Sequence, residues 1–420
     1  MDKNNTNNTT AKNTWAFGLI AVLFLHAFDY LSYSGVTSLM PILRNTLKMT
    51  YTQVGIFNSI SSIAMIISAL VAGTAVHKFG EKKVLIASFL LSTAGLLGIS
   101  YASTFNTALM FRFWQQAFYR ATMISTMTAA NLAVPASFRG RALGLTGVAT
   151  GIGGIIGSPL GVAISELVGL GNSLRIYCLF HIIGIIIFWS AYKRYTSPEI
   201  SQPTHDTTAM SCKPSQSPYK NKIVMGLTAI SFLLAAPIHY YFSIITVDLF
   251  HKSNMAGAVI ASIGNAGAII FNLGAGISAD KFTHLKTVFI ISALCTVNCL
   301  AMAIACAIKN YELFCINSVL WTFSMTARYN ILYAVVGDAM NGKHIGTING
   351  LLAFAYAVGE LVVNYGSSFI INKAGGFFMF FALVAVLVGT ASFIALRINK
   401  RLSNISSLSA SEKAAQSQGG

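Results

Sequence analysis

The chain has 420 residues, of which 55% are hydrophobic and only 10% are charged. Soluble proteins carry about 25% charged residues, so the composition excludes an ordinary water-soluble enzyme, a disordered regulator and a nucleic-acid-binding domain. The formal net charge of +16 needs a separate explanation, which depends on where the basic residues lie along the chain.

Long apolar runs recur from one end of the chain to the other. A membrane-spanning helix needs about 20 mostly apolar residues, and twelve such runs are separated by polar or Gly- and Pro-containing breaks. They predict helices near 15–41, 53–76, 84–102, 106–134, 142–169, 173–192, 223–249, 255–279, 287–308, 312–336, 345–371 and 376–396. We therefore expect an all-α membrane protein with two six-helix bundles.

The polar segments divide this predicted protein into parts. The bundles span 15–192 and 223–396, a central loop spans 193–222, and polar tails span 1–14 and 397–420. With the amino terminus inside, 19 of the 28 Lys and Arg residues fall on the inner side, six on the outer side and three within helices. Because cytoplasmic loops are enriched in Lys and Arg, both termini are predicted to be cytoplasmic, in an inner or plasma membrane. Orientation thus explains most of the basic excess, and no nucleic-acid partner is expected.

Two short patterns occur in both halves of the chain. The segment 73–83 after the second run is repeated at 276–286, and the segment 139–144 after the fourth run is repeated at 341–346. The offsets are 203 and 202 positions, which indicates duplicated halves, a recurrent architecture of transporters.

The segment 73–83 resembles the loop signature of the major facilitator superfamily, G-x-x-x-D-[RK]-x-G-[RK]-[RK]-x, and the resemblance extends over nearly the whole chain. His77 and Glu81 depart from the signature, standing where Asp and a basic residue are expected. The resemblance implies the fold of that family, a loop that stabilises one access state, and a cavity lined by helices one, four, seven and ten. The residues expected to take part in conformational gating are Gly73, His77, Lys78, Gly80, Asp280, Lys281, Arg139 and Arg141.

Three arginines lie inside predicted helices: Arg112 and Arg120 in the fourth run and Arg328 in the tenth. An arginine at the centre of a membrane helix costs about 2.5–3.5 kcal/mol, so it is expected to be paired, wetted or functional. Because guanidinium groups bind carboxylates and phosphates in a bidentate way, Arg120 and Arg328 are predicted to bind an anionic substrate. The predicted substrate-binding set also includes Arg112 and Gln116, which share a helix face with Arg120, and Asn330.

Two acidic residues lie at comparable depth, Asp29 in the first run and Glu360 in the eleventh. Burial favours the protonated form of a carboxyl group, and a neighbouring arginine opposes this. A carboxyl group that alternates between such environments can carry a coupling proton, so we expect this role for Asp29 and, second, for Glu360. The alternative is that both acids are fixed counter-charges of the arginines, which leaves one positive charge in excess.

The seventh run contains Pro237 followed by His239, Tyr240 and Tyr241. Proline interrupts the helical hydrogen-bond ladder, and in membrane proteins such breaks are tolerated where they line a cavity. The three residues after it are therefore predicted to contact the substrate or form a gate. The fifth run contains Gly153, Gly157 and similarly spaced glycines, for which close helix packing is the preferred interpretation; they also loosely resemble a signature of proton-driven exporters.

The preferred hypothesis is a secondary active transporter that takes up a small organic anion or carboxylate-bearing zwitterion together with protons. The alternatives are a proton-antiport exporter of drugs or metabolites and a non-transporting membrane sensor. No catalytic constellation, metal-spaced His cluster or dinucleotide site is visible, so neither an enzyme nor a cofactor is expected. The expected partners are the substrate, protons and the lipid bilayer, and the expected oligomeric state is a monomer.

Overall fold

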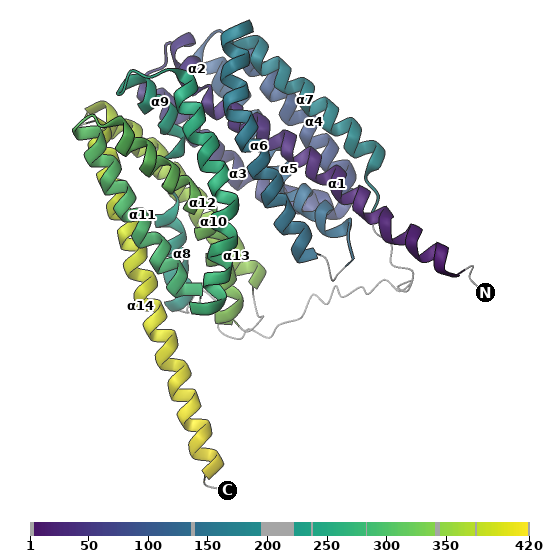
Figure 1. Cartoon of the computed structure of the whole chain (residues 1–420), viewed down its shortest axis with the longest axis vertical. Helices are drawn as coiled ribbons and strands as arrows, with labels where there is room; N and C mark the ends of the chain where they lie inside the picture. Colours follow the sequence, from purple (N-terminus) through teal and green to yellow (C-terminus); the bar gives the residue numbers. More distant parts are fainter. Residues whose placement is uncertain are drawn as a thin grey trace. The chain divides into compact units, whose positions relative to one another are not determined.

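The computed structural model describes residues 4–135, 139–194, 222–236, 238–282, 284–340, 345–373 and 376–418, and within these ranges all regular structure is α-helical (Figure 1). The helices are α1 (Asn4–Ser38), α2 (Met40–Thr46), α3 (Tyr51–Phe79), α4 (Glu81–Ser100), α5 (Phe105–Leu132), α6 (Arg139–Val168), α7 (Leu170–Ala191), α8 (Lys222–Leu234), α9 (His239–Asp248), α10 (Asn254–Phe282), α11 (His284–Ala307), α12 (Tyr311–Met340), α13 (Ile345–Lys373) and α14 (Gly376–Gln418).

Each of the twelve apolar runs is helical, and the seventh is divided into α8 and α9. Within the described ranges, nine helical segments are long and apolar enough to cross a membrane, α8 and α9 counting as one. Helices α3, α5 and α12 are not among the nine. Two of these carry the buried arginines, Arg112 on α5 and Arg328 on α12.

The chain divides into two compact units. Unit 1 comprises residues 1–213, 238–269 and 364–369, so it holds α1 to α7, α9, the first half of α10 and a short piece of α13. Unit 2 comprises residues 214–237, 270–363 and 370–420, which hold α8, the rest of α10 and α13, and α11, α12 and α14. A boundary between the units falls between the end of α8 at Leu234 and the start of α9 at His239.

Local sequence signals explain where the unit 1 helices begin and end. Thr50 and Thr104 cap α3 and α5 through reciprocal hydrogen bonds with the third helical residue, which satisfy otherwise unpaired backbone N–H groups. Gly80 lies between α3 and α4 with φ +85°, a conformation that side chains disfavour. These signals permit a direct turn from one long helix into the next.

Helix α1 packs along α6, and glycines allow the approach. A Cβ atom at Gly157 would overlap the Leu31 carbonyl oxygen, and one at Gly153 would lie 2.5 Å from the Ala27 carbonyl oxygen. Side chains larger than hydrogen would therefore push the two helices apart. The packing interpretation is confirmed for Gly153 and Gly157.

Unit 2 has its own packed interior. Helix α11 packs against α14 and α12, with Cys295 and Cys299 completely buried. Helix α13 meets α8 where a Cβ atom at Gly359 would overlap the Phe232 carbonyl oxygen, and the Ser231 hydroxyl donates to the Leu352 carbonyl at 2.8 Å. Helix α14, yellow in Figure 1, continues beyond the other helices of its unit.

Candidate substrate and proton site

One face of α1 carries four ionisable side chains, His26, Asp29, Tyr30 and Tyr33. Their spacing places them within an arc of about 100° on the helix, since successive residues differ by about 100°. Asp29 is buried, with 2% of its surface exposed. Its Oδ2 atom has no hydrogen-bond partner among the described residues.

A second polar face lies on α5, where Arg112, Gln116 and Arg120 keep the spacing that the sequence shows. Arg112 is buried, donates from Nη1 to the Gln115 Oε1 atom at 2.9 Å, and lies with Cζ 5.2 Å from the centre of the Phe57 ring. Gln116 is buried too, and neither its amide oxygen nor its amide nitrogen has a hydrogen-bond partner among the described residues. Arg112 is thus held by neighbours, while the Gln116 amide keeps its full capacity for a ligand or water.

The two faces meet in a group that we name the Asp29 cluster: Asp29, Tyr30, Tyr33, Tyr119 and Arg120. Asp29 interacts electrostatically with Arg120, and Tyr119 interacts with all four other members. The Tyr33 and Tyr119 rings stack with centroids 5.2 Å apart and planes at 11°, and the Tyr30 and Tyr33 centroids are 5.4 Å apart. The structure therefore brings the predicted proton residue and one predicted anion residue together inside unit 1.

Of the three candidates after Pro237, Tyr240 reaches this cluster. The Tyr240 and Tyr33 hydroxyl oxygens are 2.5 Å apart, and the His239 ring lies 4.2 Å from the Tyr240 ring. Tyr241 points elsewhere, since its hydroxyl donates to the Asn364 carbonyl at 3.2 Å. Tyr33 and Tyr119 were not among the predicted site residues, because apolar periodicity does not distinguish a tyrosine at a site from one in a core.

The carboxyl end of α9 is attached to α2 by an ion pair. Asp248 forms an ion pair with Arg44 of α2 and accepts a hydrogen bond from the Tyr51 hydroxyl of α3 at 2.6 Å. The Arg44 guanidinium also lies 4.2 Å from the centre of the Tyr51 ring. Burial, and then the hydrogen bond to the Asp248 carboxylate, raise the pKa of the Tyr51 phenol. The sequence placed Arg44 and Asp248 only near the ends of predicted spans; their opposite charges were the signal that could have paired them.

In unit 2, Arg328 is buried with 1% of its surface exposed. Its Cζ atom lies 4.3 Å from the centre of the Trp321 ring, one face of α12 supplying both residues. Among the described residues, neither its Nε nor its Nη1 atom has a hydrogen-bond partner. Glu360 on α13 is also buried. The side chain of Asn330 lies outside the described residues.

The predicted gating residues are only partly described. His77 and Lys78 are exposed at the end of α3, and Gly80 forms the turn already noted. The surroundings of Gly73 and the side chains of Asp280, Lys281, Arg139 and Arg141 lie outside the described residues. Their gating roles stay predictions.

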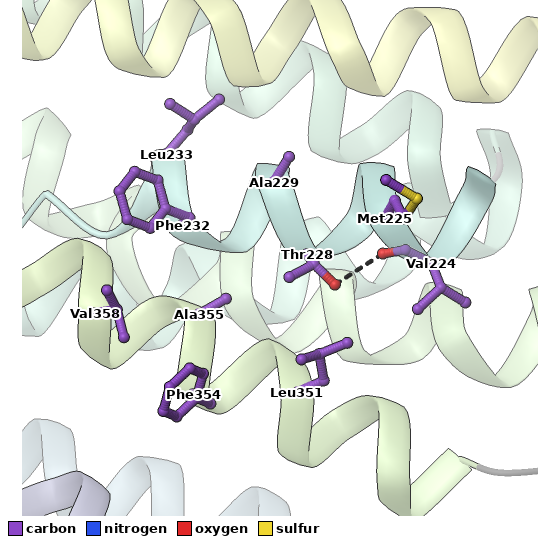
Figure 2. A pocket seen from close by; sticks show the side chains of 10 residues that line it. All are labelled: Val224, Met225, Thr228, Ala229, Phe232, Leu233, Leu351, Phe354, Ala355 and Val358. Carbon is purple, nitrogen blue, oxygen red and sulfur yellow. Dashed lines mark hydrogen bonds between the residues drawn. The ribbon is translucent and has the colours of Figure 1, made fainter. Parts of the chain in front are cut away.

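A cavity of about 600 Å³ lies in unit 2 between α8 and α13 (Figure 2). It is lined by Val224, Met225, Thr228, Ala229, Phe232, Leu233, Leu351, Phe354, Ala355 and Val358. The one hydroxyl in this set, that of Thr228, donates to the Val224 carbonyl at 2.8 Å. The cavity offers no charged group to an anion, so its size does not make it the candidate site. Within the described part of the chain, no group of three His, Cys, Asp or Glu side chains could hold a metal ion.

Known proteins resemble this chain over most of its length. Residues 22–364 match the model of the Major Facilitator Superfamily. The chain is 23% identical over 405 residues to the hexuronate transporter of Bacillus subtilis (strain 168), covering 90% of this chain and 93% of that protein.

Solved structures share its fold at low sequence identity. One is a D-xylose–proton symporter, with a TM-score of 0.75, 13% identity and coverage of 90% of this chain and 97% of that one. Another is a mutant of the nucleoside transporter NupG, with a TM-score of 0.70, 14% identity and coverage of 90% and 99%.

Proposed function

The chain belongs to the major facilitator superfamily of membrane transporters and is not an enzyme, and on that premise we propose that it takes up a small organic anion, or a carboxylate-bearing zwitterion, by proton-coupled alternating access. The observation that carries the proposal is the Asp29 cluster, in which a buried carboxyl group and an arginine interact electrostatically. The carboxyl group can hold a proton, and the arginine can hold an anion. Each ligand changes the charge that the other experiences, which is the physical basis of coupling.

Arg120 is the proposed substrate contact in unit 1. It is partly buried, with its guanidinium 5.7 Å from the centre of the Tyr119 ring. When Asp29 is ionised, its charge competes with a substrate carboxylate for Arg120. When Asp29 binds a proton, that competition ends, so proton binding favours substrate binding.

Arg328 is the proposed anion contact in unit 2. The Trp321 ring holds the guanidinium against one face, and the unpartnered Nε and Nη1 atoms are donors that a carboxylate can accept from. Arg112 and Gln116 are proposed as further polar contacts, with Arg112 the weaker candidate because Gln115 already accepts from it. Glu360 is proposed as a second proton-binding carboxyl group.

The substrate class rests on charge and on one relative. The hexuronate transporter carries a substrate named as an organic acid, which agrees with arginines at buried positions. The names of the structural neighbours, a xylose symporter and a nucleoside transporter, refer to other classes of substrate, so the fold alone does not select an anion. Proton-antiport export is the alternative, because Gly153 and Gly157 of α6, which pack against α1, loosely resemble a signature of exporters. We further propose a monomer with both termini in the cytoplasm.

Uptake into proteoliposomes tests the proposal. A panel of radiolabelled hexuronates, other carboxylates, phosphorylated compounds and amino acids is offered with and without an inward proton gradient. Arg120→Gln and Arg328→Gln should each raise the KM of the transported anion about tenfold or more, because a charge-assisted hydrogen bond contributes about 1.5–3 kcal/mol. Asp29→Asn should abolish gradient-driven accumulation.

Arg175 provides the matched control, since it donates to Asn172 at 2.9 Å and lies on the Tyr101 ring. Arg175→Gln removes the same charge and should leave the KM unchanged. Transport of no anionic or zwitterionic compound, or unchanged transport in both arginine variants, would reject the anion site. Accumulation that persists in Asp29→Asn would reject Asp29 as the proton carrier.

A further inference from the structure

His26 lies one helical turn from Asp29 on the same face of α1. Three residues correspond to about 4.5 Å along the helix axis, and both side chains are buried, with 1% and 2% of their surfaces exposed. The two groups are therefore a titratable pair in a water-poor setting. The proposed function uses only the carboxyl group.

The hydrogen bonds around His26 determine which ring nitrogen is free. The Thr150 hydroxyl donates to the Thr146 carbonyl at 3.0 Å, which uses its only hydrogen. The Thr150 oxygen, 2.9 Å from His26 Nε2, must then accept, so Nε2 carries the hydrogen. His26 Nδ1 is left with a lone pair and, among the described residues, with no hydrogen-bond partner.

Asp29 is the one acidic residue within α1, and helices α5 and α6 pack against that helix. Helix α6 presents the neutral Thr146 and Thr150. Helix α5 presents Tyr119 and Arg120, both in the Asp29 cluster.

The remaining neighbours of α1 contribute little charge. Helix α7 meets α1 at Gly184, which faces Leu25 and Phe28. Helix α9 contributes Tyr240, which bonds to Tyr33, and the His239 ring beside it. A basic nitrogen and a carboxyl oxygen without partners thus lie one turn apart, while the acid of α9, Asp248, is paired with Arg44 of α2.

We propose that His26 is a second proton-binding group, which relays the coupling proton between Asp29 and the cytoplasmic end of α1. The proposal rests on the proposed proton coupling and on a cytoplasmic amino terminus. The proton leaves the Asp29 carboxyl group and binds His26 Nδ1, which yields a carboxylate beside Arg120 and an imidazolium held by Thr150. The imidazolium then gives one proton to water on the cytoplasmic side, which restores neutral His26.

His26→Gln tests the relay with little change in shape. The glutamine amide nitrogen can replace Nε2 as the donor to Thr150, but the side chain has no basic nitrogen. The matched control is His181→Asn. His181 is equally buried, and its Nδ1 contacts Thr93, whose hydroxyl donates to the Phe89 carbonyl. His181 therefore has an environment similar to that of His26, but no carboxyl group lies one helical turn away from it.

Two measurements on radiolabelled glucuronate in proteoliposomes separate the relay from folding and from substrate binding. The first is exchange of internal for external substrate at equal pH, and the second is accumulation under an inward gradient of about one pH unit. One proton per substrate supports about tenfold accumulation. We expect His26→Gln to exchange within about twofold of the wild type yet not to accumulate, and its exchange rate to lose the wild-type pH dependence. His181→Asn should exchange and accumulate glucuronate as the wild type does.

The outcomes distinguish this proposal from the one it rests on. Full accumulation by His26→Gln, with a wild type that responds to the gradient, overturns the relay and leaves the proposed function intact. If His26→Gln loses both exchange and accumulation, the relay is also overturned, because His26 is then a structural residue. A wild type that exchanges glucuronate but does not accumulate it under the gradient contradicts both proposals.

Discussion

Replacing Arg328 with methionine separates a substrate-binding arginine from a structural one. A buried arginine at the centre of a membrane helix costs about 2.5–3.5 kcal/mol. The contact with the Trp321 ring offsets about 1–2 kcal/mol of this cost. No described residue accepts from Nε or Nη1, so the wild type should bear a net cost of about 1–2 kcal/mol in the absence of substrate. Methionine is unbranched and apolar, and it fills irregular space well.

Arg328→Met should therefore raise the thermal unfolding midpoint by roughly 2–6 °C in detergent, measured by fluorescence-detected size-exclusion chromatography after heating. The same variant should lose substrate-dependent stabilisation and raise the KM for the anion about tenfold or more. Arg112→Met is the contrasting variant: it should lower the midpoint, because removing Arg112 leaves the buried Gln115 amide oxygen without its donor. A lower midpoint for Arg328→Met would refute the reasoning and identify Arg328 as a structural counter-charge.

Two further changes test the packing of unit 1. Asp248→Asn should weaken the attachment of α9 to Arg44 by about 2 kcal/mol, because both side chains are only 21% exposed. Amide hydrogen exchange in residues 239–248 should then become roughly 30-fold faster. An unchanged exchange rate, or an equal change in the control variant Glu166→Gln at an exposed position, would contradict this. Gly157→Leu should separate α1 from α6, because the leucine side chain would overlap the Leu31 carbonyl oxygen. The thermal unfolding midpoint should fall by several degrees in the heating assay. A stable, active variant would show that the close contact between α1 and α6 is dispensable.

Patterns local in sequence predicted most of the fold. Twelve apolar runs gave the helices, and the four-residue spacing of Arg112, Gln116 and Arg120 gave a polar face on α5. The seventh run contains a proline, which cannot donate a backbone hydrogen bond, and this run is divided into α8 and α9. These features succeed because helix periodicity is decided within a few residues.

Contacts between distant segments could not be predicted in the same way. Tyr33 meets Tyr240 across 207 positions, and Arg44 meets Asp248 across 204. A tyrosine on an apolar helix or a charge at a helix end is compatible with many partners, and only the packing of α9 in unit 1 selects one. Unpartnered atoms are a further example: the sequence places His26 within a predicted helix, but its free Nδ1 atom follows only from the direction of the Thr150 hydrogen bond.

At position 81 the chain has a glutamate where the loop signature has a basic residue, and the surrounding structure explains why an acid is favourable there. Glu81 begins α4, where a negative charge is favourable at the helix N-terminus, and it accepts a hydrogen bond from the Tyr192 hydroxyl at 3.0 Å. The next residue, Lys82, donates to the Trp189 and Tyr192 carbonyl oxygens at the end of α7, where a positive charge is favourable. A basic residue at position 81 would lose the Tyr192 bond and place like charges side by side. In this chain the start of α4 is therefore attached to the end of α7 within its own unit, and Glu81 supplies one of the three hydrogen bonds of that attachment.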